Sequence, residues 1–251
     1  MLIALGWDVG GWQGKKQGFA VAVWDGMNIE WKGIPFVTSL VQLGSDPIQV
    51  LHTLWHRFME TEGIDPNDMV VIGIDAPLGW PMDFQALINN TAHIPTIVEK
   101  QIDNRYAYRD TERYIYYRYK KMPLSASFDK LGNNATVAAA YVKEWVRQEG
   151  YRVLPQHGES LGFRSIIEVY PGLEKRRKPI GNIMVQSALE RLPQLLSDDA
   201  DDAYDAAICA LLALSMADQE GVTNLPHLEG PADKGIDDAV LQAEGWIYHW
   251  K

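Results

Sequence analysis

The chain has 251 residues, of which 47% are hydrophobic and 22% are charged, enough for one large domain with its own core. Its formal net charge of −10 argues against a protein whose whole surface binds nucleic acid, but it does not exclude a local basic groove. The single cysteine, Cys209, excludes an intrachain disulfide bond, and no apolar run approaches the roughly 20 residues that cross a bilayer. The first residues lack the pattern of a signal peptide, so we expect a cytoplasmic protein that does not engage a membrane.

The first half of the chain predicts four strands and one helix, from runs of apolar residues and from helical spacing. Residues 2–7 are nearly all apolar, which is typical of a central strand, and a glycine-rich turn follows at residues 10–14. The other elements predicted here are an antiparallel pair of strands at residues 18–24 and 28–36, a helix at 47–62 and a strand at 70–74.

The second half is less regular at first and then strongly helical. We expect a single domain over residues 1–251, with residues from about 80 to 160 forming a partly helical insertion or cap within it. The elements predicted in this half are a helix at 136–148, a strand at 164–170, helices at 182–196 and 201–218, and a short edge strand at 244–248. This order predicts an α/β protein with a mixed sheet and helices on both faces.

Five carboxylates stand where an α/β protein is expected to have a site. The first and fourth strands both end on a glycine, a large apolar residue and an aspartate, which are Asp8 and Asp75. The carboxyl edge of a parallel sheet is where such proteins bind ligands, and neighbouring strands lie about 4.8 Å apart. Glu168 interrupts an apolar strand and therefore needs a partner or an ion. Asp202 and Asp205 share one face near a helix start, where the helix dipole favours anions.

Each of these residues also has a purely structural explanation. An aspartate at a strand end braces a turn about as often as it does chemistry, and one at a helix start is usually a cap. Gathered in one place, however, the carboxylates would raise one another's pKa, and a divalent cation relieves that repulsion. Carboxylate oxygens suit Mg²⁺ or Mn²⁺, so these carboxylates are candidates for holding such an ion.

One segment, residues 105–121, departs from the acidic balance of the chain because it combines six basic residues with six tyrosines. Arginine side chains bind phosphates through two parallel hydrogen bonds, and tyrosine rings stack on exposed bases. Arg109 and Arg113 are the predicted phosphate contacts, because they lie four residues apart on one helix face. The alternative is an amphipathic helix whose tyrosines pack on the core and in which Arg109 or Arg113 pairs with Glu112.

Six short motifs occur in order along nearly the whole chain. They are Gly6-Trp7-Asp8-Val9-Gly10, Gly73-Ile74-Asp75-Ala76-Pro77-Leu78-Gly79, Arg109-Asp110-Thr111-Glu112-Arg113, Glu168-Val169-Tyr170-Pro171, Asp202-Ala203-Tyr204-Asp205-Ala206 and Glu244-Gly245-Trp246-Ile247. This ordered set resembles the domain-of-unknown-function family numbered 429, whose members are predicted nucleases with a ribonuclease H-like fold. The last helix also resembles the catalytic helix of RuvC-type Holliday-junction resolvases.

The resemblance implies a five-stranded mixed sheet of order 3-2-1-4-5, in which strand 2 is antiparallel and a helical insertion separates strands 4 and 5. The strands of Asp8 and Asp75 would then be neighbours. The two aspartates, with one or both of Asp202 and Asp205, would match the metal-binding carboxylates of ribonuclease H-like enzymes. The chain departs from one pattern, since RuvC-like enzymes often carry glutamate where Asp75 stands.

These observations favour a metal-dependent nuclease that hydrolyses phosphodiester bonds with two ions and takes DNA or RNA as its substrate. The catalytic candidates are Asp8, Asp75, Glu168, Asp202 and Asp205.

Two alternatives stay open. The first strand and its glycine-rich turn also resemble the first phosphate loop of the actin, sugar-kinase and Hsp70 ATPases, which implies an ATP-dependent phosphotransferase. The second alternative is a non-catalytic domain that binds nucleic acid or a protein. The sequence leaves the oligomeric state open.

Overall fold

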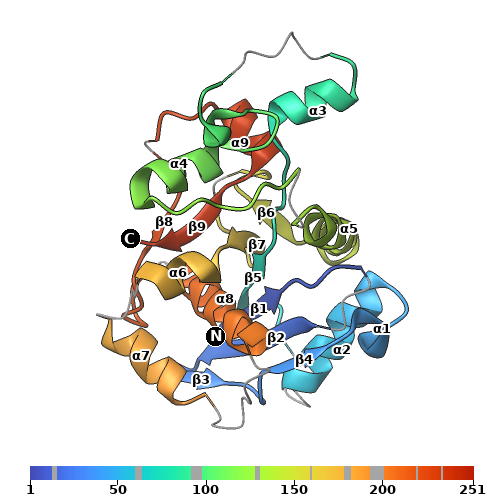
Figure 1. Cartoon of the computed structure of the whole chain (residues 1–251). Coiled ribbons are helices and arrows are strands. Elements are labelled where there is room, and N and C mark those ends of the chain that lie inside the picture. The colour runs from blue at the N-terminus through green and yellow to red at the C-terminus, as the bar shows by residue number, and fades with distance from the viewer. Residues whose placement is uncertain are drawn as a thin grey trace.

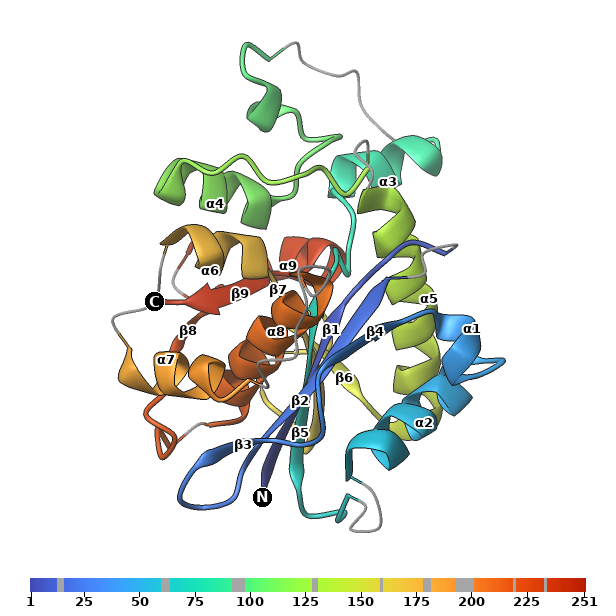
Figure 2. The same ribbon diagram turned by 60° about the horizontal axis from the view of Figure 1, so that its bottom comes forward.

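A mixed and strongly curled β-sheet runs through the centre of the protein, and helices cover both of its faces (Figures 1 and 2). The computed structural model describes residues 1–12, 16–59, 64–91, 98–127, 131–158, 160–177, 182–192, 201–218, 220–232 and 234–251. Within these ranges, only the backbone is described for Leu131, Arg176, Arg177 and Asp201.

The strands of the described residues are β1 (Leu2–Asp8), β2 (Gln17–Trp24), β3 (Ile29–Trp31), β4 (Phe36–Thr38), β5 (Met69–Asp75), β6 (Arg152–Leu154), β7 (Arg164–Val169), β8 (Leu228–Glu229) and β9 (Ile247–Trp250). The α-helices of the same part of the chain are α1 (Leu40–Leu43), α2 (Pro47–Met59), α3 (Met82–Ile88), α4 (Asp110–Tyr119), α5 (Leu131–Glu149), α6 (Pro171–Arg177), α7 (Ile183–Glu190), α8 (Asp201–Ala217) and α9 (Asp238–Glu244). A single 3₁₀ turn, η1 (Gln101–Asp103), precedes α4.

The main path of the sheet has the order β3-β2-β1-β5-β7-β9-β8. Strands β1, β5, β7 and β9 are parallel, whereas β2 is antiparallel to β1 and β8 is antiparallel to β9. The predicted order 3-2-1-4-5 and the antiparallel second strand are therefore confirmed for the first five strands of this path. The predicted extent is wrong, because β9 and β8 continue the sheet, while β4 pairs with β2 and β6 with β7.

Two apolar cores lie on opposite faces of the sheet because successive side chains of a strand point to opposite sides. On one face, Ala4 of β1 and Val71 of β5 pack against α7 and α8. On the other face, Leu5 and Ile72 of the same two strands pack against α2 and α5. Cys209 is fully buried in the first core, where it packs as a small apolar side chain.

Some element boundaries differ from those predicted. The strand expected at residues 28–36 is two short strands, β3 and β4, and the edge strand expected at 244–248 is β9, which lies inside the sheet. The helix expected from residue 136 begins at Leu131, so Asn133 and Asn134 belong to its first turn. Their side chains bind the loop after β1, since Asn133 accepts from the Trp12 N–H and Asn134 donates to the Val9 carbonyl. The helix predicted at 47–62 is α2, and residues 60–62 lie outside the described residues. The helix predicted at 182–196 is α7, which already ends at Glu190, and residues 193–196 lie outside the described residues.

The segment between β5 and β7 has two parts that lie in different places. Helices α3 and α4 lie beyond the carboxyl ends of β1 and β5, at the top of Figure 2. Glu244 at the end of α9 anchors both helices, because its carboxylate accepts the backbone N–H groups of Met82 at 2.8 Å and Asp110 at 2.7 Å. Helix α5 instead packs into the second core, so only α3 and α4 have the position of a cap. In the described residues, no helix is long and apolar enough to span a membrane.

Candidate functional site

Asp8 and Asp75 lie side by side at the carboxyl ends of β1 and β5. The two strands pair in parallel with Asp8 directly opposite Asp75, which confirms that the two aspartates end neighbouring strands. Trp7 and Ile74, the residues before them, point into the core on the α2 and α5 side. Because side chains alternate along a strand, the two carboxylates lie on the other face, the one that α8 covers.

Glycines at three strand positions let α8 lie directly on the sheet. A β-carbon at Gly6 would stand 1.9 Å from the carbonyl oxygen of Ala206, and one at Gly73 would stand 2.5 Å from that of Cys209. At Gly18, on β2, the distance to the carbonyl oxygen of Asp202 would be 2.1 Å. Any larger side chain would push the helix away. The glycine two residues before each strand-end aspartate therefore brings the start of α8 close to both carboxylates.

The first turns of α8 add two more carboxylates to the strand ends. Asp205 raises the pKa of both Asp8 and Asp75 by charge repulsion, and Asp202 raises that of Asp8. The side chains of Asp202 and Asp205 are both partly buried. The structure thus brings together four of the five predicted catalytic carboxylates, from three elements that lie far apart in the sequence.

The strand-end aspartates have strongly raised pKa values. Burial, followed by repulsion from Asp75, Asp205 and Asp202, raises the pKa of Asp8 to about 9. Burial, followed by repulsion from Asp205 and Glu168, raises that of Asp75 to about 8. The charged forms of both groups are therefore unfavourable without a cation beside them.

The donor chemistry at these strand ends fits Mg²⁺ or Mn²⁺, which prefer carboxylate oxygens. As the side chains stand, however, no group of three His, Cys, Asp or Glu residues in the described ranges is placed to hold an ion. One reason is Lys175 of α6, whose ammonium lies 2.7 Å and 2.9 Å from the two carboxylate oxygens of Asp205. An ion shared by Asp8, Asp75 and Asp205 would have to bind where this ammonium now neutralises the Asp205 charge.

Glu168 lies close to Asp75 but its carboxylate is bound by Arg109. The Arg109 guanidinium donates to both Glu168 oxygens, at 2.6 Å and 2.8 Å, and the Leu78 N–H adds a hydrogen bond at 2.9 Å. The two ionic side chains are almost fully buried. The partner that the sequence required for this glutamate is therefore an arginine, and Glu168 acts on Asp75 through its charge.

All five N–H groups of Arg109 have acceptors inside the protein. Two donate to Glu168, two donate to Glu112 at 2.8 Å and 3.0 Å, and one donates to the Glu244 carbonyl at 3.0 Å. Arg113 has an ion pair with Asp110 and donates to the Tyr108 carbonyl. This arrangement favours the structural alternative, in which Arg109 pairs with Glu112, over a phosphate contact by either arginine.

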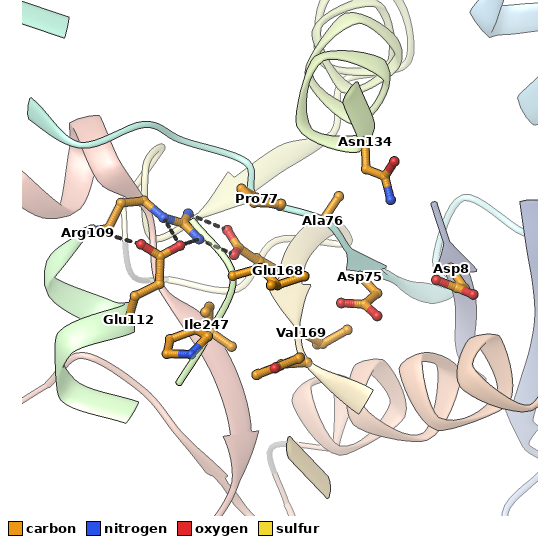
Figure 3. Close-up of a pocket in the computed structure, with 13 residues that line it drawn as sticks. Asp8, Asp75, Ala76, Pro77, Arg109, Glu112, Asn134, Glu168, Val169 and Ile247 are labelled. Carbon is orange, nitrogen blue, oxygen red and sulfur yellow. Dashed lines mark hydrogen bonds and ion pairs between the residues drawn. The ribbon is translucent and has the colours of Figure 1, made fainter. Parts of the chain in front are cut away.

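A cavity of about 140 Å³ opens between these two groups of charges. Asp8, Asp75 and Asn134 line one side of it, and the Arg109, Glu112 and Glu168 network lines the other (Figure 3). Its remaining wall is largely apolar and is contributed by Ala76, Pro77, Pro123, Leu124, Val169, Tyr170 and Ile247. The carboxylates of the strand ends therefore face a small, partly apolar hollow.

Two lysines near the carboxylates, Lys121 and Lys175, do not belong to the predicted site. Both lower the pKa of Asp75 through their positive charge. The Lys121 ammonium donates to the Gly172 carbonyl of α6 and lies 4.5 Å from the centre of the Tyr170 ring. The signal that points to Lys175 is the basic run at residues 175–178, which begins six residues after β7, the strand of Glu168.

The glycine-rich turn after β1 is tied to neighbouring side chains. Gln17 is fully buried, and its amide accepts from the Gly10 N–H at 3.0 Å and donates to the Gly10 carbonyl at 2.9 Å. The Trp12 N–H donates to Asn133 at 3.2 Å. Two backbone N–H groups that a phosphate loop would offer to ATP are thus already bound. This observation weighs against the phosphotransferase alternative.

Comparisons with known families, curated proteins and solved structures find no match for this chain. The resemblance to the family numbered 429 therefore stays a prediction, as does the cytoplasmic location.

Proposed function

We propose that this protein is a metal-dependent phosphodiesterase that acts on nucleic acid. The observation that carries the proposal is the meeting of Asp8, Asp75, Asp202 and Asp205 at one edge of the sheet, where Asp8 and Asp75 line a cavity and have strongly raised pKa values. Perturbed carboxylates at the carboxyl edge of an α/β sheet are typical of catalytic sites.

The sheet supports a ribonuclease H-like core as part of this proposal. Its path begins with the order expected for that fold, and its second strand is antiparallel to the first. The helix that carries Asp202 and Asp205, whose motif resembles the catalytic helix of RuvC-type resolvases, lies on the central strands. The strands β9 and β8 are then additions at one edge of that core.

The chemistry follows from the residues at the strand ends. Asp8, Asp75 and Asp205 would hold Mg²⁺ or Mn²⁺, which activates water for attack on phosphorus and stabilises the leaving oxygen. Glu168 and Arg109 are positioning residues in this account, since their ion pair fixes the edge of the cavity next to Asp75. Lys121 and Lys175 supply positive charge beside the site of a chain whose net charge is −10.

The test is cleavage of single-stranded, duplex and branched DNA and RNA oligonucleotides with and without Mn²⁺. We expect the wild type to cleave at least one of these substrates only with the ion. Asp8→Asn and Asp75→Asn should each lower the rate at least about 100-fold, because each variant loses a charged ligand. Asp238→Asn, an exposed change in α9, is the matched control and should retain the wild-type rate.

Two results would contradict the proposal. The first is cleavage that survives in both the Asp8→Asn and the Asp75→Asn variant. The second is the absence of metal-dependent cleavage of every substrate by a wild-type protein that also fails to bind Mn²⁺.

A further inference from the structure

We infer that Lys175 is the resident counter-ion of the carboxylates, and that a divalent cation must displace its ammonium from Asp205 to bind. The inference rests on the proposed function, because it concerns the same carboxylates. It goes beyond that function by giving a lysine outside the predicted site a defined role, which is to set how tightly the ion binds.

The geometry of the ion pair is the first support. The Lys175 ammonium lies 2.7 Å and 2.9 Å from the two oxygens of Asp205 and donates a hydrogen bond to the second, so its charge lies directly against the carboxylate. The Asp205 side chain is only 18% exposed, while that of Lys175 is 34% exposed. The lysine can therefore swing into solvent, whereas the aspartate stays at the strand ends.

The charges around the pair are the second support. Asp205 repels both Asp8 and Asp75, and Lys175 is a cation that partly offsets this repulsion at both groups. A divalent ion would serve the same purpose with twice the charge and with oxygen ligands on several sides. An ion at Asp205 would lie next to the ammonium, and the repulsion between the two positive charges makes the two cations compete for this carboxylate.

Lys121 separates the effect of a nearby positive charge from the effect of the direct contact between Lys175 and Asp205. Its charge also acts on Asp75, but its ammonium donates to the Gly172 carbonyl and lies over the Tyr170 ring. A divalent ion at Asp205 therefore leaves the contacts of Lys121 in place. The two lysines form a matched pair, since Lys175 contacts the proposed ligand Asp205 and Lys121 acts on Asp75 through its charge.

The experiment measures Mn²⁺ affinity by titration calorimetry in the wild type and in Lys175→Gln, Lys121→Gln and Lys143→Gln variants of the full chain. Lys143 is exposed on α5 and controls for the loss of one positive charge. We expect Lys175→Gln to bind Mn²⁺ about fivefold more tightly than the wild type, because a partly exposed ion pair no longer opposes binding. Lys121→Gln should gain clearly less, and Lys143→Gln should equal the wild type.

Three other outcomes would overturn the competition, and one would support it. Equal or weaker Mn²⁺ binding by Lys175→Gln, while the wild type binds the ion, overturns the competition but leaves the proposed function standing. An equal gain of Mn²⁺ affinity in Lys121→Gln would show that any nearby positive charge opposes the ion, with no special part for the contact between Lys175 and Asp205. That result would also overturn the inference. Failure of every variant to bind Mn²⁺ overturns the proposed function and the competition together. Binding by Lys175→Gln alone would support the competition in its strongest form.

Discussion

The Arg109 side chain is fully buried, and two carboxylates from different elements balance its charge. Glu112 lies one helical turn away, but Glu168 lies 59 residues further along the chain. From the sequence alone, the basic and aromatic segment around Arg109 indicates a phosphate contact and an ion pair equally well. The distant partner decides between the two, and only the folded chain brings that partner into contact.

Replacing Arg109 should therefore act on stability. In Arg109→Met, the carboxylates of Glu112 and Glu168 stay buried without their cation, which should cost about 3–5 kcal/mol of unfolding free energy in urea titrations. Arg113→Gln, a change at a more exposed arginine, should cost less than about 1 kcal/mol. An Arg109→Met protein of unchanged stability that has lost affinity for oligonucleotides would contradict the structural role.

The raised pKa of Asp8 predicts how the stability of the folded protein changes with pH. The unfolded aspartate ionises near pH 4, whereas the folded one holds its proton until about pH 9, so the folded state loses stability as the pH rises between these values. Asp8→Asn removes this loss. In EDTA at pH 8, thermal unfolding of the variant should occur about 2–4 °C above the wild type, equivalent to at least about 1 kcal/mol.

The same two proteins should unfold at nearly equal temperatures at pH 4, where the wild-type carboxyl is protonated in the folded state and about half protonated in the unfolded state. A difference that does not change between pH 4 and pH 8 would contradict the raised pKa of Asp8.

At the scale of elements, the close approach of α8 to the sheet determines the site. The glycines of β1 and β5 are visible in the sequence as Gly-Trp-Asp and Gly-Ile-Asp, and a glycine in a buried strand signals a close backbone neighbour. The sequence predicted the strand ends and the helix separately. It left open that the two glycines lie in register, which the pairing of Gly6 with Gly73 now shows.

Gly6→Ala tests this packing. Its new methyl group would overlap the Ala206 carbonyl, so α8 must shift, and we expect a loss of about 3 kcal/mol in unfolding free energy together with weaker Mn²⁺ binding. Gly132→Ala in α5 is the matched control, because its methyl group would meet the nearest heavy atom at an ordinary 3.6 Å. This control should be neutral or stabilising by up to about 1 kcal/mol. Equal stability of the two variants would contradict the close contact of α8 with the sheet.

The elements that the sequence missed are short or depend on tertiary contacts. Strand β8 has two residues and β6 has three, too few for a periodic pattern to appear. Helix α9 follows a segment rich in glycine, proline and charges, and its last residue, Glu244, joins the backbones of α3 and α4. Long apolar runs such as β1, β5 and α8 were predictable because burial on two sides leaves a continuous signal.

At the scale of the whole molecule, carboxylates from β1, β5 and α8 meet at one edge of the sheet, beneath the cap of α3 and α4 (Figures 1 and 2). The sequence identified these carboxylates by residue type and position, whereas only the basic run at residues 175–178 pointed to the lysine that holds Asp205. We propose that the strand-end carboxylates bind a divalent ion.

The most direct measurement is anomalous diffraction from crystals of the protein soaked in Mn²⁺. The account predicts an anomalous peak within coordination distance of Asp8, Asp75 and Asp205, with the Lys175 ammonium moved away from Asp205. A soaked crystal with no peak at these carboxylates, and with Lys175 still on Asp205, would contradict it.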